Sequence, residues 1–487
     1  MMKKQKNTIQ IKTIAIILII IVISFLITSY SSVINPFSDD DPYDSWIFRY
    51  MGMLILKGGL PYRDAFEQKG PLLFIYEAIG ILINKEFGIW ILELISMIIF
   101  MFLTYRLCRL FAKSFPALII SIASVGSFSI FFSGNMSEEF ALPFMAASII
   151  IYTDYLLFNK YTDMRIMLCG FCCGAVFMLR PNMVALWIVM SIAVIINSVK
   201  QSKKFPGRMT LLFSSGFFIP IIPIIIWFSV TGALHDFINQ YFLFNFQYTA
   251  EPHSITEQLG VMWDFSKYSM LIIPIIILTG ISIKYKKYRF FNITFICYIL
   301  LNLILCTVSV RGYLHYGMPL VTCHAYPLIL LFNVLTETDK YGDKRIGMLP
   351  YLLCIVYSFT LIVFFCNNVR TLIISATNDK LTETDHRMIA EIQELTSPDD
   401  KILVIGKKSW IYYESDRLCS SIYFIQEPIY ELNSLLKEDI KNDINENYPK
   451  LYINGYSGEI VLYDELFDHL DEYTLYDKQT KIYILSE

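Results

Sequence analysis

Acidic side chains beside apolar runs are the first candidates for chemistry in this sequence. Asp41 and Asp44 belong to an acidic stretch that follows the first long apolar run, and a helical pattern of apolar residues begins just after Asp44. A carboxylate in such a place can accept a proton from a substrate hydroxyl group as a general base. Because Asp is also favoured as a helix N-cap, capping is the competing interpretation of Asp44.

Further charged residues stand in short turns between later apolar runs. Glu138 and Glu139 precede a run that begins at Ala141, where a helix dipole alone would favour acidic side chains. Arg180 joins two runs, and a guanidinium there can either extend to the membrane interface or bind a phosphate group. None of these signals is specific alone, and they gain weight only by falling on one membrane face. A further turn of the same kind contains Arg311, Tyr313, His315 and Tyr316.

The composition places these residues in a membrane protein. Of the 487 residues, 55% are hydrophobic and only 17% are charged, and the mean hydropathy is +0.50. Soluble domains carry about 25% charged residues, so soluble and disordered classes are excluded. The net charge of -3 indicates no nucleic-acid partner. Cys169 and Cys172 lie in an apolar run, and we interpret them as small buried residues rather than metal ligands or a disulfide.

Apolar runs of membrane-spanning length predict about eleven transmembrane helices. They lie near Ile11–Tyr30, Ile89–Tyr105, Phe115–Phe132, Ala141–Phe158, Ile166–Leu179, Val184–Val199, Leu211–Val230, Met270–Ile283, Phe291–Val310, Gly317–Leu335 and Leu349–Phe365. A shorter run, Pro71–Asn84, is predicted to be a helix at the membrane surface or dipping into it. With the N-terminus in the cytoplasm, about 20 lysines and arginines fall in the inner segments, against 8 in the outer segments that precede the C-terminal region.

Two of the segments predicted to lie on the outer side have predicted secondary structure of their own. In the first outer loop, residues 31–70, a short amphipathic helix is predicted over Ser45–Lys57, and Gly58 should end it. Residues 367–487 are predicted to form a small extracytoplasmic α/β domain, with strands at Lys401–Gly406, Leu451–Tyr456 and Lys481–Leu485. Helices are predicted there over Pro428–Ile444 and Glu459–Tyr473. The fold expected is an all-α polytopic domain, residues 1–366, followed by this domain.

The first outer loop also carries a resemblance. The runs Tyr43–Gly52 and Gly59–Pro71 resemble the first outer loop of bacterial membrane glycosyltransferases of the dolichyl-phosphate-mannose protein mannosyltransferase and lipid A aminoarabinose transferase type. Glu138-Glu139, Leu179–Asn182 and Ser409–Tyr413 are similar to later parts of these proteins. The resemblance implies the fold of the C-type glycosyltransferases, GT-C.

Roles for individual residues follow from the resemblance. An acidic residue of the first outer loop acts as base in that family, and by position Asp44 matches it. Asp41 and Glu139 are further catalytic candidates. A phosphate leaving group needs cationic partners. The outer-side candidates for binding the donor phosphate are Arg63, Lys69, Arg180, Arg311 and His315. The candidates for contacting substrate are Asp64, Glu67, Glu138 and Tyr313.

The function implied is transfer of a sugar from a polyprenyl-phosphate carrier to a cell-surface glycan, lipid or protein on the outer face of the cell membrane. No cofactor is implied with certainty, although a divalent cation near the aspartates stays open; no set of metal ligands with defined spacing is present. A transporter or flippase of lipid-linked sugars is the alternative. Transporters usually show repeated halves and charges at the bilayer midplane, whereas here the polar residues gather at the predicted outer side.

Overall fold

A computed structural model supplies the architecture. It describes residues 2–29, 43–126, 133–202, 206–249, 253–340, 381–406, 408–426, 436–455 and 466–486, together with positions 31, 33, 131, 363, 366, 367 and 370. The chain divides into two compact units. Unit 1 comprises Met1–Ile34, Trp90–Ile224 and Pro252–Ala376, and unit 2 comprises Asn35–Ile89, Ile225–Glu251 and Thr377–Glu487.

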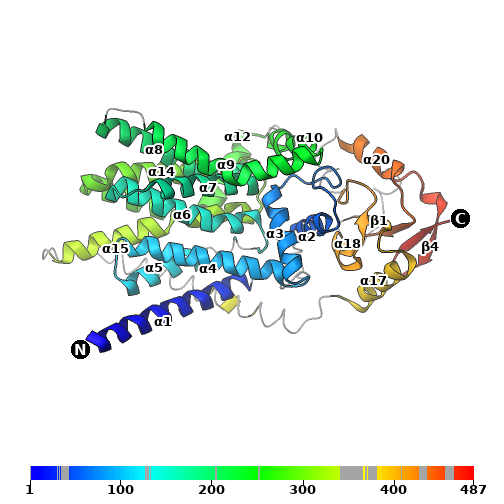
Figure 1. The fold of residues 1–487 in the computed structure, drawn as a ribbon, viewed down its shortest axis with the longest axis horizontal. Helices are drawn as coiled ribbons and strands as arrows, with labels where there is room; N and C mark the ends of the chain where they lie inside the picture. Colours follow the sequence, from blue (N-terminus) through cyan, green and yellow to red (C-terminus); the bar gives the residue numbers. More distant parts are fainter. Residues whose placement is uncertain are drawn as a thin grey trace. The chain divides into compact units, whose positions relative to one another are not determined.

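The secondary structure in the described parts of unit 1 consists of helices joined by loops (Figure 1). Its elements are α1 Met2–Thr28, α4 Gly88–Arg109, α5 Ser114–Gly126, α6 Ser137–Phe158, α7 Asp163–Leu179, the 3₁₀ turn η2 Pro181–Met183, α8 Ala185–Ser202, α9 Gly207–Val230, α12 Ile255–Tyr268, α13 Ile272–Lys284, α14 Lys286–Cys306, the 3₁₀ helix η4 Leu314–Cys323 and α15 Ala325–Lys340. Helices satisfy their own backbone hydrogen bonds, which a lipid environment requires.

Several of these helices can cross a bilayer, so the chain is a multi-pass membrane protein. By length and composition, six helices among the described residues qualify, or up to seven if α12 and α13, bent by 77°, form one span. The predicted spans near Phe115–Phe132, Ile166–Leu179 and Val184–Val199 correspond to the shorter helices α5, α7 and α8. The last predicted span, Leu349–Phe365, lies almost wholly outside the described residues. The total of eleven stays a prediction.

Close packing of α7 against α9 depends on glycine. A Cβ atom at Gly170 would lie 2.0 Å from the carbonyl oxygen of Phe213, and one at Gly174 would lie 2.2 Å from that of Phe217. From the other side, a Cβ atom at Gly216 would lie 1.9 Å from the carbonyl oxygen of Met167. Small residues spaced by four let membrane helices approach to backbone contact in this way. The predicted burial of Cys169 and Cys172 on α7 is confirmed, and both thiols are free.

Unit 2 combines short helices with a sheet. Its elements are α2 Tyr43–Leu56, α3 Pro71–Ile83, α10 Leu234–Phe237, the π-helix η3 Ile238–Phe244, α11 Asn245–Thr249, α17 Glu383–Leu395, β1 Lys401–Ile405, α18 Trp410–Ser415, β2 Leu418–Cys419, α20 Leu436–Glu446, β3 Leu451–Asn454, the 3₁₀ turn η5 Leu470–Glu472, β4 Tyr473–Asp477 and β5 Ile482–Leu485. The predicted helix of the first outer loop is α2. The predicted helix after Gly70 is α3, where Pro71 takes the first helical position.

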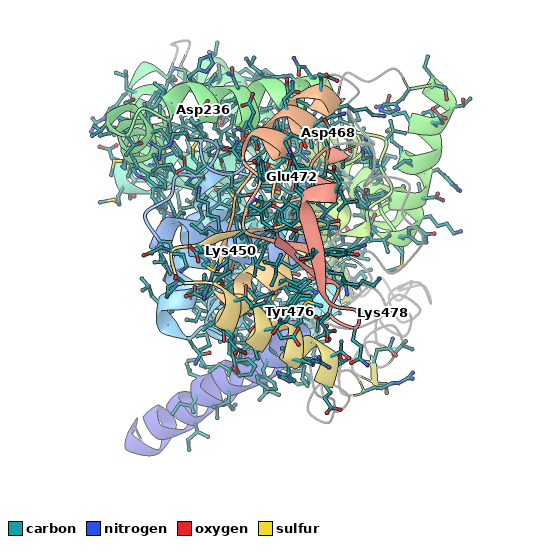
Figure 2. All side chains as sticks on the ribbon, turned by 90° about the vertical axis from the view of Figure 1, so that its right-hand side faces the viewer. Asp236, Lys450, Asp468, Glu472, Tyr476 and Lys478 are labelled. Carbon is teal, nitrogen blue, oxygen red and sulfur yellow. The ribbon has the colours of Figure 1, made fainter. Side chains whose placement is uncertain are left out.

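The sheet of unit 2 has five strands in the order β2-β1-β3-β5-β4. Strand β1 pairs in parallel with β2 and β3, and β5 pairs antiparallel with β3 and β4. The α/β character predicted for the C-terminal region is confirmed, and all three predicted strands are present. The predicted helix over Glu459–Tyr473 is wrong at its end, because η5 there leads into an unpredicted strand, β4. Figure 2 shows Tyr476 on this edge strand with Lys478 just beyond it.

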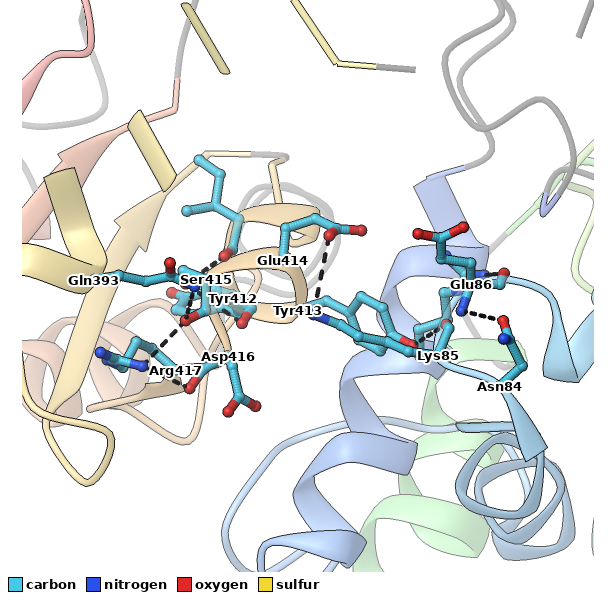
Figure 3. Close-up of polar contacts among 12 residues, drawn as sticks. Asn84, Lys85, Glu86, Gln393, Tyr412, Tyr413, Glu414, Ser415, Asp416 and Arg417 are labelled. Carbon is cyan, nitrogen blue, oxygen red and sulfur yellow. Dashed lines mark hydrogen bonds and ion pairs between the residues drawn. The ribbon is translucent and has the colours of Figure 1, made fainter. Parts of the chain in front are cut away.

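Helix α18 packs against the first-loop helices within unit 2. The hydroxyl group of Tyr413 donates to the carbonyl oxygen of Lys85 at 2.5 Å, and the Lys85 ammonium lies 4.0 Å from the Glu414 carboxylate (Figure 3). The guanidinium of Arg49, on α2, lies 4.8 Å from the ring centroid of Trp46 and 5.2 Å from that of Tyr413. Cation–π contacts of this kind favour a desolvated guanidinium. The C-terminal region and the first outer loop are therefore one packed body.

Candidate active site

Asp44 lies in the first turn of α2 rather than before it. The helix buries the side chains of Phe48, Tyr50 and Met51, and Asp44 stays half-buried. A carboxylate in the first helical turn is stabilised by the free amides and the dipole of the helix. The helix and the placement of Asp44 beside apolar surface are as predicted. Asp41, the other proposed base, lies outside the described residues.

After α2 the chain turns sharply into the segment Leu60–Lys69, called the site loop below. Gly58 has φ +83° and Tyr62 has φ +72°. The left-handed region is open to glycine but costs a side-chain-bearing residue energy, and such strain occurs often at functional sites. The ring of Tyr62 is buried, and its amide donates to the carbonyl oxygen of Ala65 at 2.9 Å. Gly58 therefore ends α2 as predicted, and Tyr62 shapes the loop.

Arg63 and Asp64 form a fork on the site loop. Arg63 donates from Nε to Oδ1 of Asp64 at 2.7 Å and from a terminal nitrogen to Oδ2 at 2.8 Å. The amide of Leu60 also donates to Oδ2, at 2.8 Å. Burial would raise the pKa of the Asp64 carboxyl, but the fork and the Leu60 amide outweigh it and lower that pKa. Asp64, a predicted substrate contact, thus holds the loop and matches the charge of Arg63.

Glu67 and Lys69 lie with Asp44 in one electrostatic cluster. Burial raises the pKa of the Glu67 carboxyl, the Lys69 ammonium opposes that rise, and the Asp44 carboxylate adds to it. The Lys69 ammonium lies 5.9 Å from the ring centroid of Phe48, one helical turn after Asp44, and Lys69 is 9% exposed. Within unit 2, the Lys69 ammonium and the Asp44 carboxylate therefore both act electrostatically on the Glu67 carboxyl group.

In unit 1, Glu138 and Arg180 form an ion pair. The Arg180 guanidinium lies 3.8 Å from the ring centroid of Tyr316, and Ser137 donates to the second Glu138 oxygen at 2.8 Å. Both charged side chains are largely buried. A buried pair of this kind is maintained by its mutual attraction and hydrogen bonds. Arg180, predicted to bind phosphate, is therefore already matched by a carboxylate.

The predicted residues of the turn Arg311–Tyr316 lie near the ion pair of Glu138 and Arg180, which contacts Tyr316. The ring of His315 lies 4.6 Å from that of Tyr316 and 6.0 Å from that of Tyr313, nearly parallel to the latter. Tyr313 is 51% exposed. Arg311 is half-buried and follows Val310, which has φ +54°. The structure thus joins Arg180, His315 and Tyr313 through Tyr316.

Glu139 forms a hydrogen bond with Glu93, a residue that was not among the candidates predicted from the sequence. Its Oε1 accepts from the amide of Gly134 at 3.0 Å, and its carboxyl group is hydrogen-bonded to that of Glu93. Glu93 also accepts from the Ser31 hydroxyl at 2.7 Å and from the Asn135 amide at 2.9 Å. Glu93 is an acidic residue inside an apolar run, and this pattern could have identified it as a candidate from the sequence.

Within the described part of the chain, no three His, Cys, Asp or Glu side chains converge as metal ligands do. The candidate residues described above are mostly carboxylates and cations. The cluster in unit 2 combines a proton acceptor with an ammonium group in a desolvated loop. Such a cluster suits a reaction in which a hydroxyl group loses a proton and an anion departs.

Two solved structures are similar to the whole chain. The crystal structure of ArnT from Cupriavidus metallidurans bound to undecaprenyl phosphate matches with a TM-score of 0.61 and 9% identity, over 97% of each chain. The apo structure of ArnT from the same organism matches with a TM-score of 0.56 and 10% identity, over 91% of this chain and 92% of that one. The GT-C fold implied by the sequence resemblance is confirmed.

Among curated proteins no match was found. A protein-family model, that of the competence-induced Ccs4 N-terminal domain, matches residues 3–348. This range covers α1 through α15, including the helix that bears Asp44 and the whole site loop. With well over half of its length matched, the chain belongs to the Ccs4 N-terminal domain family of competence-induced proteins.

Proposed function

We propose that the protein is a glycosyltransferase that moves a sugar from a polyprenyl-phosphate carrier to a cell-surface acceptor. The observation that carries the proposal is the cluster of Asp44, Glu67 and Lys69 on the first outer loop. Its support from outside the chain is the fold shared with ArnT, whose structure contains undecaprenyl phosphate. The sugar and the acceptor are left unspecified, because no described side chain distinguishes them.

The reaction proposed is a single displacement at the anomeric carbon. Asp44 takes the proton of the acceptor hydroxyl group as that oxygen bonds to the anomeric carbon. The bond between this carbon and the phosphate oxygen breaks, and polyprenyl phosphate leaves with the bonding electrons. One displacement inverts the configuration of the sugar. Because phosphate is a good leaving group, no second carboxylic acid is required, unlike in glycoside hydrolysis.

Lys69 is the proposed partner of the departing phosphate. Its ammonium is 9% exposed, and in such a desolvated place a fixed charge stabilises a developing anion more strongly than in water. Arg63 is the second cation of the loop, with 46% of its side chain exposed and its charge matched by Asp64. In unit 1, Arg311 and His315 stay proposals for contacting an anionic group. Glu139 stays a proposed catalytic residue and Asp41 the alternative base.

The placement of the protein is also a proposal. About eleven spans, an N-terminus in the cytoplasm and a C-terminal domain outside would set the site loop on the outer face of the cell membrane. Lysines and arginines favour inner loops, and the sequence has the bias that this orientation needs. Residues 1–366 as a transmembrane domain and 367–487 as an extracytoplasmic domain complete the proposal.

The test is the surface glycan composition of cells carrying the wild-type protein, Asp44→Asn, Lys69→Met or no protein. We expect one sugar to be lost in the null strain and in both variants, with normal protein levels. Asp468→Asn is the matched control, because its carboxylate pairs with Lys441 at the surface, where ion pairs contribute little. A glycan that persists with Asp44→Asn but disappears without the protein would overturn Asp44 as the base. No change in the null strain would overturn the function.

A further inference from the structure

A helical segment far along the chain contacts the site loop within unit 2. This clamp segment, Leu234–Thr249, runs through α10, the π-helix η3 and α11 without a break. π-Helical turns are rare and occur mostly at functional sites, because the extra residue per turn redirects the side chains. The sequence of this segment is rich in Tyr, Phe and Asn. Its helical form gives it defined faces.

One face of the clamp segment packs on Tyr62. The ring of Phe237 lies 5.3 Å from that of Tyr62 and stacks on Tyr241 at 5.5 Å, with 16° between the ring planes. The rings of Phe228 and Phe237 also stack, at 4.8 Å and 16°. All four rings are buried. Aromatic rings with few rotatable bonds form a stiff contact, so the strained turn at Tyr62 has a rigid support.

Gln240 uses both ends of its amide on the site loop. Its Nε2 donates to the carbonyl oxygen of Tyr62 at 2.5 Å, and its Oε1 accepts from the amide of Glu67 at 3.3 Å. Gln240 thus ties together two backbone groups that lie five residues apart. A side chain of this length with one donor and one acceptor end is suited to that geometry.

Asn245 holds the loop one residue further on. Its Nδ2 donates to the carbonyl oxygen of Gln68 at 2.8 Å and to that of Tyr241, on its own segment, also at 2.8 Å. Glu67 in turn accepts from the amides of Gln68 and Lys69 at 2.9 and 3.1 Å. The backbone on both sides of Gln68 is therefore fixed, and with it the position from which the Lys69 side chain leaves the loop.

We infer that Gln240 and Asn245 are positioning residues for Lys69, which hold the donor-phosphate cation in place without touching the substrate. The inference rests on the proposed function for the identity of the ligand. A site that binds a phosphate group gains from a preformed cation, because less ordering is left to the moment of binding. The side-chain amides of Gln240 and Asn245 hold the loop in place from a segment about 175 residues away. Single substitutions can remove their hydrogen bonds one at a time.

The experiment measures the binding of undecaprenyl phosphate, the probe, to the full-length protein in lipid nanodiscs. Gln240→Glu keeps the acceptor for the Glu67 amide but loses the donor to Tyr62, and Asn245→Leu loses the contact with Gln68. Each should weaken binding about tenfold, the effect of losing one well-placed hydrogen bond. Asn239→Asp is the matched control, because the Asn239 amide contacts His235 on its own segment. Hydrogen exchange of the amides of Gln68 and Lys69 should become faster in both variants and stay unchanged in the control.

A double-mutant cycle separates positioning from general stability. In a Lys69→Met background, Gln240→Glu should cause little further loss of affinity, because the cation that it positions is gone. Equal losses in both backgrounds, or slow exchange of Gln68 and Lys69 in Gln240→Glu, would overturn the inference. If the wild-type protein does not bind the probe at all, the proposed function fails instead. Faster exchange in the variants with unchanged affinity for the probe would overturn Lys69 as the reason for the clamp.

Discussion

The hydroxyl group of Tyr62 donates a hydrogen bond of 2.7 Å to the backbone carbonyl oxygen of Lys69. This bond closes the site loop on itself, since Tyr62 near its beginning and Lys69 at its end are joined directly. The loop is therefore a ring of contacts rather than a flexible connection. Its geometry is set by buried groups, and each group can be tested.

Removing this hydroxyl group should loosen the loop while leaving its packing intact. Tyr62→Phe keeps the ring among its aromatic neighbours but leaves a buried carbonyl oxygen without its donor, at a cost of about 1–3 kcal/mol. We expect a lower thermal unfolding midpoint and weaker binding of undecaprenyl phosphate. Tyr476→Phe, at an exposed position of β4, is the control and should change neither. An unchanged Tyr62→Phe protein would show that the bond contributes nothing.

Replacing Lys69 should affect binding more than folding. Lys69→Met keeps an unbranched apolar side chain over the Phe48 ring and removes the charge, so affinity for undecaprenyl phosphate should fall by tenfold or more, roughly the contribution of one charge-assisted contact. Equilibrium binding to nanodisc-embedded protein measures this. Lys478→Met, in the exposed turn after β4, is the matched control. Equal affinity of the Lys69→Met and wild-type proteins would remove Lys69 from the phosphate site.

The buried carboxyl group of Glu67 should make stability depend on pH. Burial raises its pKa from 4.5, so the folded protein binds this proton more tightly than the unfolded chain does. Stability should then fall as pH rises, beginning at the ordinary pKa and ending at the raised one. Glu67→Gln keeps an oxygen to accept from the amides of Gln68 and Lys69 but does not titrate. Thermal midpoints measured across the acidic range should decline for the wild type and stay flatter for the variant; identical profiles would contradict the assignment.

The contact between α7 and α9 should not tolerate a side chain. Gly170→Leu would place atoms where the carbonyl oxygen of Phe213 now lies, and overpacking of this kind costs about 1–3 kcal/mol or more. We expect a lower yield of monodisperse protein in detergent and a lower thermal midpoint. Gly280→Leu provides the comparison, because a Cβ atom at Gly280 meets no atom within 4 Å. Equal behaviour of the two variants would contradict the packing.

Deleting the chain after about residue 379 should spare membrane insertion, because each span satisfies its own backbone hydrogen bonds. The deletion removes the carbonyl oxygen of Ile422, which accepts from the amide of Phe66 at 2.8 Å, and the ring of Phe424, which stacks on Tyr50 at 4.1 Å. The first outer loop should then become sensitive to protease in intact membranes. A truncated protein that fails to insert would show that the domain boundary is wrong.

Local patterns in the sequence predicted much of this architecture. Apolar runs indicated the long helices, the periodicity after Asp44 indicated α2, and Gly58 marked its end. Continuous buried runs such as Lys401–Ile405 indicated strands of the sheet. These features depend on a few neighbouring residues, so they are visible without a structure. Strand β4 was not predicted, because only Tyr473 in it is buried. A mostly exposed edge strand shows little apolar pattern in the sequence.

The contacts that shape the candidate site were beyond the reach of sequence. Gln240 and Tyr62 lie 178 residues apart, and nothing in the composition of either segment indicates that they meet. Arg63 and Arg180 were predicted to bind the donor phosphate, whereas each is matched by a carboxylate, Asp64 and Glu138 respectively. Residue types suggest which groups can do chemistry. Which of them are already neutralised depends on packing between distant segments for Arg180 and Glu138, and on the conformation of the site loop for Arg63 and Asp64.

Unit 2 is assembled from three separated stretches, the last of which begins at Thr377. During synthesis the first stretch leaves the ribosome hundreds of residues before Ile422 is made. The carbonyl oxygen of Ile422 accepts from the amide of Phe66 in that stretch. The helices of unit 1 can insert in order as they are made, but the loop that bears Asp44 and Lys69 lacks this contact until Ile422 has been made. A chain released early would reach the membrane without a finished loop. The site loop therefore gains one of its backbone contacts only after most of the chain has been made.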